Sequence, residues 1–259
     1  MHNEFEVFFF LRGEVNYIVE QRVYALKPGD ILVFNSTEFH YPTFRANAEF
    51  ERVVLHFDPA VAQQVSTPRT PLLRCFLSRP QGEKNLVQLP AKERERALAL
   101  ALQIEKKSQS AREGDDVLAA AHLAELLVLL LRAPQRVSRA SRVSGYVQQA
   151  LGYIGANLPQ PISLADVAQA LSVDRFYLDK TFKRETGTTV YNYILLKRLN
   201  LARVLLTQGC RVGEAAAGAG FNDYSNFIRT FKKYTGVTPA AFARAAQSAC
   251  AEPPGPGAS

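Results

Sequence analysis

The chain has 259 residues, 47% of them hydrophobic, and a formal net charge of +7 at pH 7. This length suffices for two domains of ordinary size, and this composition is typical of globular packing. Neither a basic stretch before an apolar run nor about 18 consecutive apolar residues occurs, which argues against a secretory signal and a membrane span and predicts a cytoplasmic protein. The three cysteines (Cys75, Cys210 and Cys250) are odd in number and far apart, unlike a disulfide framework or a zinc site.

The positive charge is confined to the second half of the chain. Residues 1–137 hold 17 basic and 17 acidic residues, whereas residues 138–259 hold 14 basic and 7 acidic ones. Such an excess suits a polyanionic partner, because each Lys or Arg that meets a phosphate releases a condensed counterion.

The first sixty residues contain short runs rich in Val, Ile, Phe and Tyr, namely VFFFL, VNYIVE, RVYAL, DILVF and RVVLHF. Turn signals at Arg12-Gly13, Pro28-Gly29-Asp30 and Asn35-Ser36 separate them. We therefore predict a small antiparallel β-barrel or sandwich in a domain that spans residues 1–90. Five prolines between residues 59 and 90 indicate loop with short elements.

Two helices are expected next, over residues 91–108 and 117–132, as a helical pair within residues 91–132. The second helix is apolar on more than one face and must be buried. Its own domain could cover it, but we favour a homodimer through helix 117–132, because too many leucines are present for one face. They are Leu126, Leu127, Leu129, Leu130 and Leu131.

Residues 133–146 are polar and basic and predict a linker, and residues 247–259, which end in EPPGPGAS, predict a disordered tail. Between them, residues 147–246 are expected to be helical and contain a repeat. TFKRETGTT (181–189) and TFKKYTGVT (230–238) share six residues at an offset of 49.

Each copy follows the spacing of a helix-turn-helix: a short helix, a brief turn and a second helix. A central alanine (Ala168, Ala216) suits the crowded crossing of two helices, and Ser172 or Gly220 supplies the turn. Ser163, Asp174 and Asp223 are suited to cap helices, because their oxygens can accept from free backbone N–H groups.

The second helix of each copy has one apolar and one polar face. In the second copy the predicted buried stripe is Tyr224, Phe227, Ile228, Phe231 and Tyr234 or Thr235; in the first copy it includes Leu178 and Phe182. A solvated charged face would explain one such helix. Two in tandem favour an acidic partner.

Residues 150–245 resemble the DNA-binding domain of the AraC/XylS family of bacterial transcription regulators. The matching stretches are IxLADVAxxLxVDRxYLxxxFKxxxG from Ile162, KRLNLARVLL from Lys197 and VGEAAAxAGFxDYSNFxRxFKKYxGVTP from Val212. The resemblance implies an α+β protein of two domains, an N-terminal cupin-like β-barrel with helices and a C-terminal all-α double helix-turn-helix. A helix at about residues 190–208 would join the two modules, which would reach successive major grooves about 34–36 Å apart.

The family's pattern implies the DNA-binding residues. Base-facing positions are Arg175, Phe176, Asp179 and Lys180 in the first copy, and Tyr224, Ser225, Asn226 and Arg229 in the second. Lys183, Arg184, Lys232 and Lys233 are better placed for phosphates. Arg229 can bond guanine as a fork, Asp179 can accept from cytosine N4, and Asn226 can pair with adenine.

The N-terminal strands resemble the cupin-like sensor domain of the same family. Cupins gather His and Glu around a metal, and His2, Glu6 and His40 match three of those places only, so we expect no metal or other cofactor. We expect instead a small organic effector in the barrel interior. The candidate residues are Phe8, Phe10, Tyr17, Phe34, His40, Arg45 and His56, each aromatic alternatively being core.

The leading hypothesis is a sequence-specific, dimeric transcription regulator, and not an enzyme, controlled by an effector. Its expected partners are double-stranded DNA, the effector and a second copy of the chain, with RNA polymerase as a further candidate and no membrane. The alternative is a metal-dependent cupin enzyme fused to a DNA-binding module, and an alkylation-repair protein ranks last because no Cys has a helpful local motif.

Overall fold

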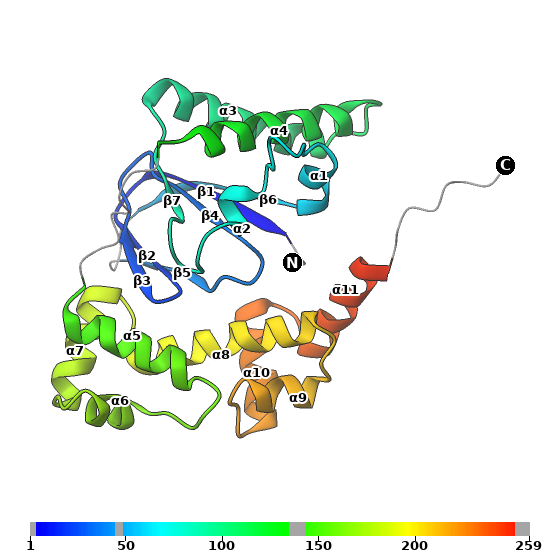
Figure 1. Cartoon of the computed structure of the whole chain (residues 1–259). Helices are drawn as coiled ribbons and strands as arrows, with labels where there is room; N and C mark the ends of the chain where they lie inside the picture. Colours follow the sequence, from blue (N-terminus) through cyan, green and yellow to red (C-terminus); the bar gives the residue numbers. More distant parts are fainter. Residues whose placement is uncertain (1–3, 45–48, 135–142, 252–259) are drawn as a thin grey trace. The chain divides into compact units, whose positions relative to one another are not determined.

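The computed structural model describes residues 4–44, 49–134 and 143–251. The chain divides into two compact units, the first ending at Arg142 and the second beginning at Val143 (Figure 1). Most of the predicted linker and the end of the predicted tail fall outside the described residues. No described helix is both long and apolar enough to cross a bilayer.

The N-terminal unit contains two antiparallel sheets. One has the strand order β6-β1-β4-β7 and the other β3-β2-β5. The strands are β1 (Phe5–Arg12), β2 (Val15–Val19), β3 (Arg22–Ala25), β4 (Ile31–Phe34), β5 (His40–Phe44), β6 (Glu51–Phe57) and β7 (Leu86–Val87). Over the described residues the two sheets do not close into a barrel, so the sandwich reading of the strand pattern is the correct one.

Gly13 is one reason why the chain forms two sheets. Strands β1 and β2 are joined by only two residues, yet β1 pairs with β4 and β6 while β2 pairs with β3 and β5. The chain changes sheet at Gly13, whose φ is +112°, and a Cβ there would lie 2.6 Å from the carbonyl oxygen of Glu49. Only glycine combines this backbone angle with so close an approach.

Strand β1 separates two apolar layers, because successive side chains of a strand point to opposite faces. Phe8 and Phe10 lie among the buried residues of the sandwich interior. Phe5, Val7 and Phe9 pack on the other face against the helices. These helices are α1 (Pro59–Gln64), α2 (Arg74–Leu77), α3 (Ala91–Ser108) and α4 (Asp115–Arg132), and α3 and α4 cover the larger sheet in Figure 1.

Helix α4 is covered largely by its own chain. Leu126, Leu127 and Leu130 are buried in the cluster with the β-sheet, and Leu129 and Leu131 pack against that cluster half-buried. These leucines therefore do not by themselves argue for a dimer, contrary to the reasoning from the sequence. The exposed apolar side chains of the helical pair are others: Leu102, Val117 and Leu118.

The described residues of the C-terminal unit form helices joined by short turns, with no strand among them. Its elements are α5 (Gly145–Asn157), α6 (Leu164–Ala170), α7 (Arg175–Thr186), α8 (Val190–Thr207), α9 (Val212–Gly218), α10 (Tyr224–Thr235) and α11 (Pro239–Ala251). Helix α8 occupies the place expected for the joining helix. Helix α11 continues to Ala251, so the tail cannot begin at residue 247 as the sequence suggested.

Candidate DNA interface and ligand site

The two helix-turn-helix modules begin their second helices in the same way. Asp174 accepts hydrogen bonds from the amides of Phe176 and Tyr177 (2.9 Å each), and Asp223 accepts one from Asn226 (2.9 Å). The turn residues Ser172 and Gly220 both have positive φ, +53° and +84°. Both alanines at the helix crossings, Ala168 and Ala216, are buried, as predicted.

The sequence repeat is also a repeat of hydrogen bonds. The hydroxyl of Thr186 donates to the carbonyl of Phe182 over 2.8 Å, and that of Thr235 donates to Phe231 over 2.8 Å. Edge-to-face aromatic pairs recur at the same offset: Phe182 with Tyr193 at 5.6 Å, and Phe231 with Phe242 at 5.7 Å between ring centroids. Each module thus fixes its second helix with matching contacts.

Helix α7 presents a basic and aromatic face to solvent. Phe176 is 69% exposed, and the cation of Arg175 lies 4.7 Å from its ring centroid. Lys180, Lys183 and Arg184 are exposed one and two turns further on, at helical spacing from Phe176. Arg184 pairs with Glu185 at 3.0 Å at the surface, where such a pair contributes little.

Helix α10 presents the equivalent face. Ser225, Arg229, Lys232 and Lys233 are exposed, whereas Phe227 and Phe231 are fully buried on the opposite side. The guanidinium of Arg229 donates to the Asn226 side-chain oxygen over 3.2 Å, and the Thr230 hydroxyl donates to the same oxygen over 3.3 Å. Asn226 therefore orients Arg229 in this structure, and its half-buried side chain is less free to meet a base than the sequence suggested.

Asp179, which was predicted to face a base, makes a hydrogen bond within its own unit. Its carboxylate accepts a hydrogen bond from the backbone amide of Val190 over 3.2 Å, at the first residue of α8, and the residue is half-buried. The repeat offset explains why: Asp179 corresponds to Ile228, which packs against the core of the second module. Asp179 thus lies at the edge of the apolar stripe of α7.

The buried stripe of α10 contains fewer aromatics than predicted. Tyr224 is 54% exposed and Tyr234 is exposed as well, its hydroxyl donating to Asn192 over 3.2 Å. Sequence reasoning missed Tyr177, which is 53% exposed and stands edge-to-face with Tyr146 at 6.4 Å. The offset of 49 would have found it, because Tyr177 corresponds to Asn226.

The aromatic residues predicted to line an effector pocket pack together inside the sandwich. The Tyr17 ring lies 4.9 Å from Phe8 and 5.3 Å from Phe34, and Phe10 is buried in the same cluster. His40 stacks on Phe34 at 4.1 Å between ring centroids. Arg45 lies outside the described residues.

Two histidines share one carboxylate at the end of this aromatic cluster. The Nε2 atoms of His40 and His56 each lie 3.2 Å from Oε2 of Glu6. Burial alone would raise the pKa of Glu6, but the hydrogen bonds from the two imidazoles outweigh it and lower the pKa to about 2. The hydrogen bond with Glu6 in turn raises the pKa of His56 above its usual value.

This cluster differs from the metal site considered for His2, Glu6 and His40. His2 lies outside the described residues, and Glu6 and His40 are bonded to each other rather than arranged around a common point. Among the described residues, no group of three or more His, Cys, Asp or Glu side chains is placed to hold a metal ion.

Both halves of the chain match models of known domains. Residues 1–127 match an AraC-like ligand binding domain, and residues 167–245 match a helix-turn-helix domain. The melibiose operon regulatory protein of Escherichia coli K12 is 34% identical over 103 residues, which are 39% of this chain and 34% of that protein. The transcriptional activator RhrA of Rhizobium meliloti is 39% identical over 90 residues, 34% of this chain and 28% of that protein.

The chain thus spans about a third of the length of these curated relatives. Among solved structures, the C-terminal domain of AraT, a response regulator from Geobacillus stearothermophilus, is 31% identical with a TM-score of 0.40. That match covers 40% of this chain and 88% of the AraT chain.

Tandem helix-turn-helix modules in one unit and a β-sandwich in the other define the class, a two-domain DNA-binding regulator of transcription. The domain matches give the family. The chain belongs to the AraC family of transcriptional regulators and carries both its helix-turn-helix DNA-binding part and its ligand-binding part.

Proposed function

We propose that the protein binds a specific bipartite DNA sequence, with α7 and α10 in successive major grooves on one face of the duplex. The observation that carries this proposal is the paired construction of the two helices. Each starts from an aspartate cap, has the same threonine hydrogen bond in its last turn and exposes cations opposite its buried stripe. Affinity would come from phosphate contacts and specificity from base edges.

The roles divide along each helix. Base contacts are assigned to the residues nearest the helix starts, namely Arg175, Phe176, Lys180, Tyr224, Ser225, Asn226 and Arg229, with Asn226 also orienting Arg229. Phosphate contacts are assigned to Lys183, Arg184, Lys232 and Lys233, one turn further on. Asp179 is assigned a positioning role because its carboxylate holds the start of α8.

A small-molecule effector is proposed to act at the His40 and His56 end of the sandwich. The side chains of these two residues are 26% and 38% exposed, whereas the aromatic rings behind them are buried. Polar groups beside a large aromatic surface are typical of sites for small organic ligands. An effector would have to displace or extend the Glu6 contacts.

We also propose a homodimer, but through other side chains than the α4 leucines at positions 126–131. Leu102, Val117 and Leu118 on α3 and α4 are exposed apolar side chains that a second chain could cover. Contact with RNA polymerase remains an expectation from the family resemblance.

Selection of random duplexes by the 259-residue chain tests the proposal. The expected result is an enriched motif with two elements separated by about one helical turn, roughly 10–10.5 base pairs. Enrichment of a single element, or of none, would contradict the use of both modules.

A further inference from the structure

A cavity of about 380 Å³ opens on the N-terminal unit, outside the sandwich interior. It lies between α2, the turn that leads into β7 and the C-terminal end of α4. Its volume is within the range of clefts that bind small molecules, roughly 300–1,000 Å³. The effector residues named above contribute nothing to its lining.

The cavity combines an apolar wall with positive charge. Leu86, Leu130 and Leu131 supply apolar surface, while Arg74 and Lys84 stand at its polar side. No lining residue is acidic, and within the described part of the chain neither cation forms an ion pair. Unpaired cations beside apolar surface favour an organic anion.

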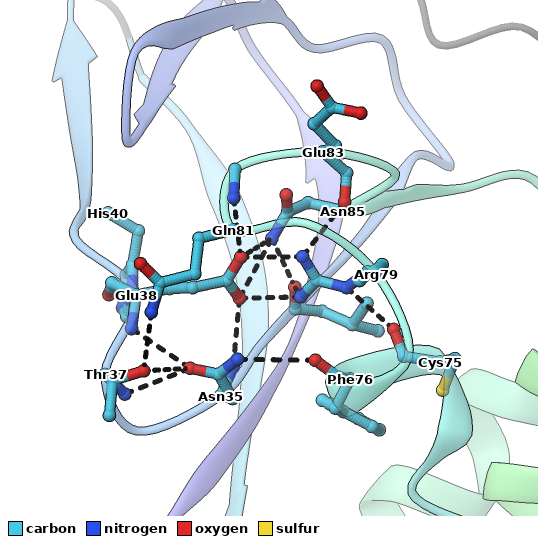
Figure 2. Close-up of polar contacts among 12 residues, drawn as sticks. Asn35, Thr37, Glu38, His40, Cys75, Phe76, Arg79, Gln81, Glu83 and Asn85 are labelled. Carbon is cyan, nitrogen blue, oxygen red and sulfur yellow. Dashed lines mark hydrogen bonds and ion pairs between the residues drawn. The ribbon is translucent and has the colours of Figure 1, made fainter.

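A third cation, Arg79, also lines the cavity, but all its N–H groups already donate to other residues of the protein. Its guanidinium meets the Glu38 carboxylate through two contacts of 2.6 Å. The remaining N–H groups donate to the carbonyls of Cys75 (2.8 Å), Glu83 (3.0 Å) and Val33 (3.1 Å). Figure 2 shows this network, in which all five donors of Arg79 are occupied.

The same network holds the turn that carries Lys84. Glu38 also accepts from the amide of Gly82 (2.8 Å) and from the side-chain amide of Asn85 (3.2 Å), on either side of Lys84 (Figure 2). Lys84 itself has a φ of +55°, a left-handed conformation that non-glycine residues seldom adopt. The turn is thus held in a strained form that places Lys84 at the cavity, where its ammonium group forms no ion pair with any described residue.

Cys75 contributes a neutral surface rather than a reactive one. Burial raises the pKa of its thiol to about 12, so the sulfur stays protonated at physiological pH. Ser78, which is exposed, adds a hydroxyl at the rim.

From these features we infer a second ligand site, separate from the sandwich interior, that binds a small carboxylate with an aromatic or aliphatic body. Arg74 and Lys84 bind the carboxylate, and the α4 leucines with Leu86 contact the body. Ala133 and Pro134 also line the cavity, so a ligand there touches the end of α4 where the described part of this unit stops. The inference does not depend on DNA binding by the other unit.

The test is ¹⁹F NMR titration of the 259-residue chain with 4-(trifluoromethyl)phenylacetate. We expect saturable binding that Arg74→Gln/Lys84→Gln weakens by at least about tenfold, because both charge-assisted contacts are lost. The matched control Arg69→Gln/Lys92→Gln removes two exposed cations of the same unit that do not line the cavity, and it should change the affinity less than about twofold. The neutral analogue 2-[4-(trifluoromethyl)phenyl]ethanol should bind far more weakly.

Ser78→Tyr provides a second variant, since the added ring fills the rim and should also reduce binding. Equal weakening by both double variants would mean general charge attraction and would overturn the site, as would an unsaturable titration of the unaltered chain at millimolar probe. DNA affinity measured on the same samples separates the two proposals, because the Arg74 and Lys84 changes should leave it intact.

Discussion

Asp179 and Val190 join α7 to α8, the helix that connects the two modules. The Asp179 carboxylate accepts from the Val190 amide over 3.2 Å, and Val190 is the first residue of α8. A side-chain acceptor at a helix start satisfies a backbone N–H group that has no partner within the helix. Helix α7 is therefore coupled to α8 as well as to its own module.

We predict that Asp179→Ala lowers the free energy of unfolding by about 1–2 kcal/mol, because the Val190 amide loses its acceptor. Asp179→Asn keeps an acceptor and should cost less. Thermal denaturation measures both variants. If Asp179→Ala instead changed the preferred base pair at one position of the DNA site and left stability unaltered, Asp179 would be a base-contacting residue.

The two turn residues should respond in opposite directions. Ser172 has a φ of +53°, and Ser172→Gly should raise the free energy of unfolding by about 0.5 kcal/mol, as relief of left-handed strain exceeds the entropy cost of glycine. Gly220→Ala should destabilise the unit by about 1–3 kcal/mol. Its Cβ would lie 2.9 Å from both Arg198 Nε and the Leu158 carbonyl oxygen. Denaturant unfolding checks the pair, and destabilisation by Ser172→Gly would contradict the strain argument.

The buried ion pair Arg79–Glu38 should contribute more to the free energy of unfolding than the exposed ion pair Arg96–Glu125. The Arg79 and Glu38 side chains are 3% and 0% exposed, so Glu38→Ala leaves an unpaired buried guanidinium and should cost about 3–5 kcal/mol. Arg96 and Glu125 form a similar two-contact pair at 2.9 Å, but in solvent. Glu125→Ala should change the melting temperature little. Comparable losses in both variants would show that burial is not the deciding factor.

The hydrogen bonds of Glu6 with His40 and His56 should make the stability of the N-terminal unit depend on pH. Each titrating group contributes to this stability over its own pH range. Glu6 has a pKa lowered from 4.5 to about 2, so its contribution is full above about pH 4.5 and is lost as the pH falls towards 2. His56 has a raised pKa, so its contribution is full below 6.5 and is lost as the pH rises through the raised value. The difference in melting temperature between the unaltered chain and His56→Gln should therefore be largest between about pH 4.5 and 6.5.

His122→Gln, on α4, serves as the control for that pH series. A His56→Gln difference that grows steadily up to pH 9 would contradict the assigned direction. The difference should also shrink in a Glu6→Gln background, since the carboxylate is the common partner of His40 and His56.

The sequence predicted local features of the chain better than it predicted which faces of the strands and helices are buried. Short runs of Val, Ile, Phe and Tyr between turn signals located the strands, and caps such as Asp174 and Asp223 marked helix starts, because both depend on near neighbours along the chain. Which faces are covered depends on distant segments. Composition alone could therefore not show that the β3-β2-β5 sheet packs on one face of β1, or that the α4 leucines are buried within their own unit.

The candidate site shows the same limit. Helical spacing placed Lys180 and Arg229 correctly on exposed faces, but the roles of Asp179 and Tyr177 depend on partners elsewhere in the chain, Val190 and Tyr146. The cavity near Arg74 combines α2 and the turn at Lys84 with the end of α4, which lies more than 40 residues further along the chain, and no local motif marks it.

Arg229 on α10 is proposed to contact a base edge, and Lys233 on the same helix is proposed to contact a phosphate. Fluorescence anisotropy with a selected duplex and a scrambled one, at several salt concentrations, distinguishes these two roles. Arg229→Ala should cost about 1–3 kcal/mol on the selected duplex and little on the scrambled one. Lys233→Ala should weaken both duplexes and lower the salt slope by about one. Equal losses on both duplexes for both variants would contradict the account.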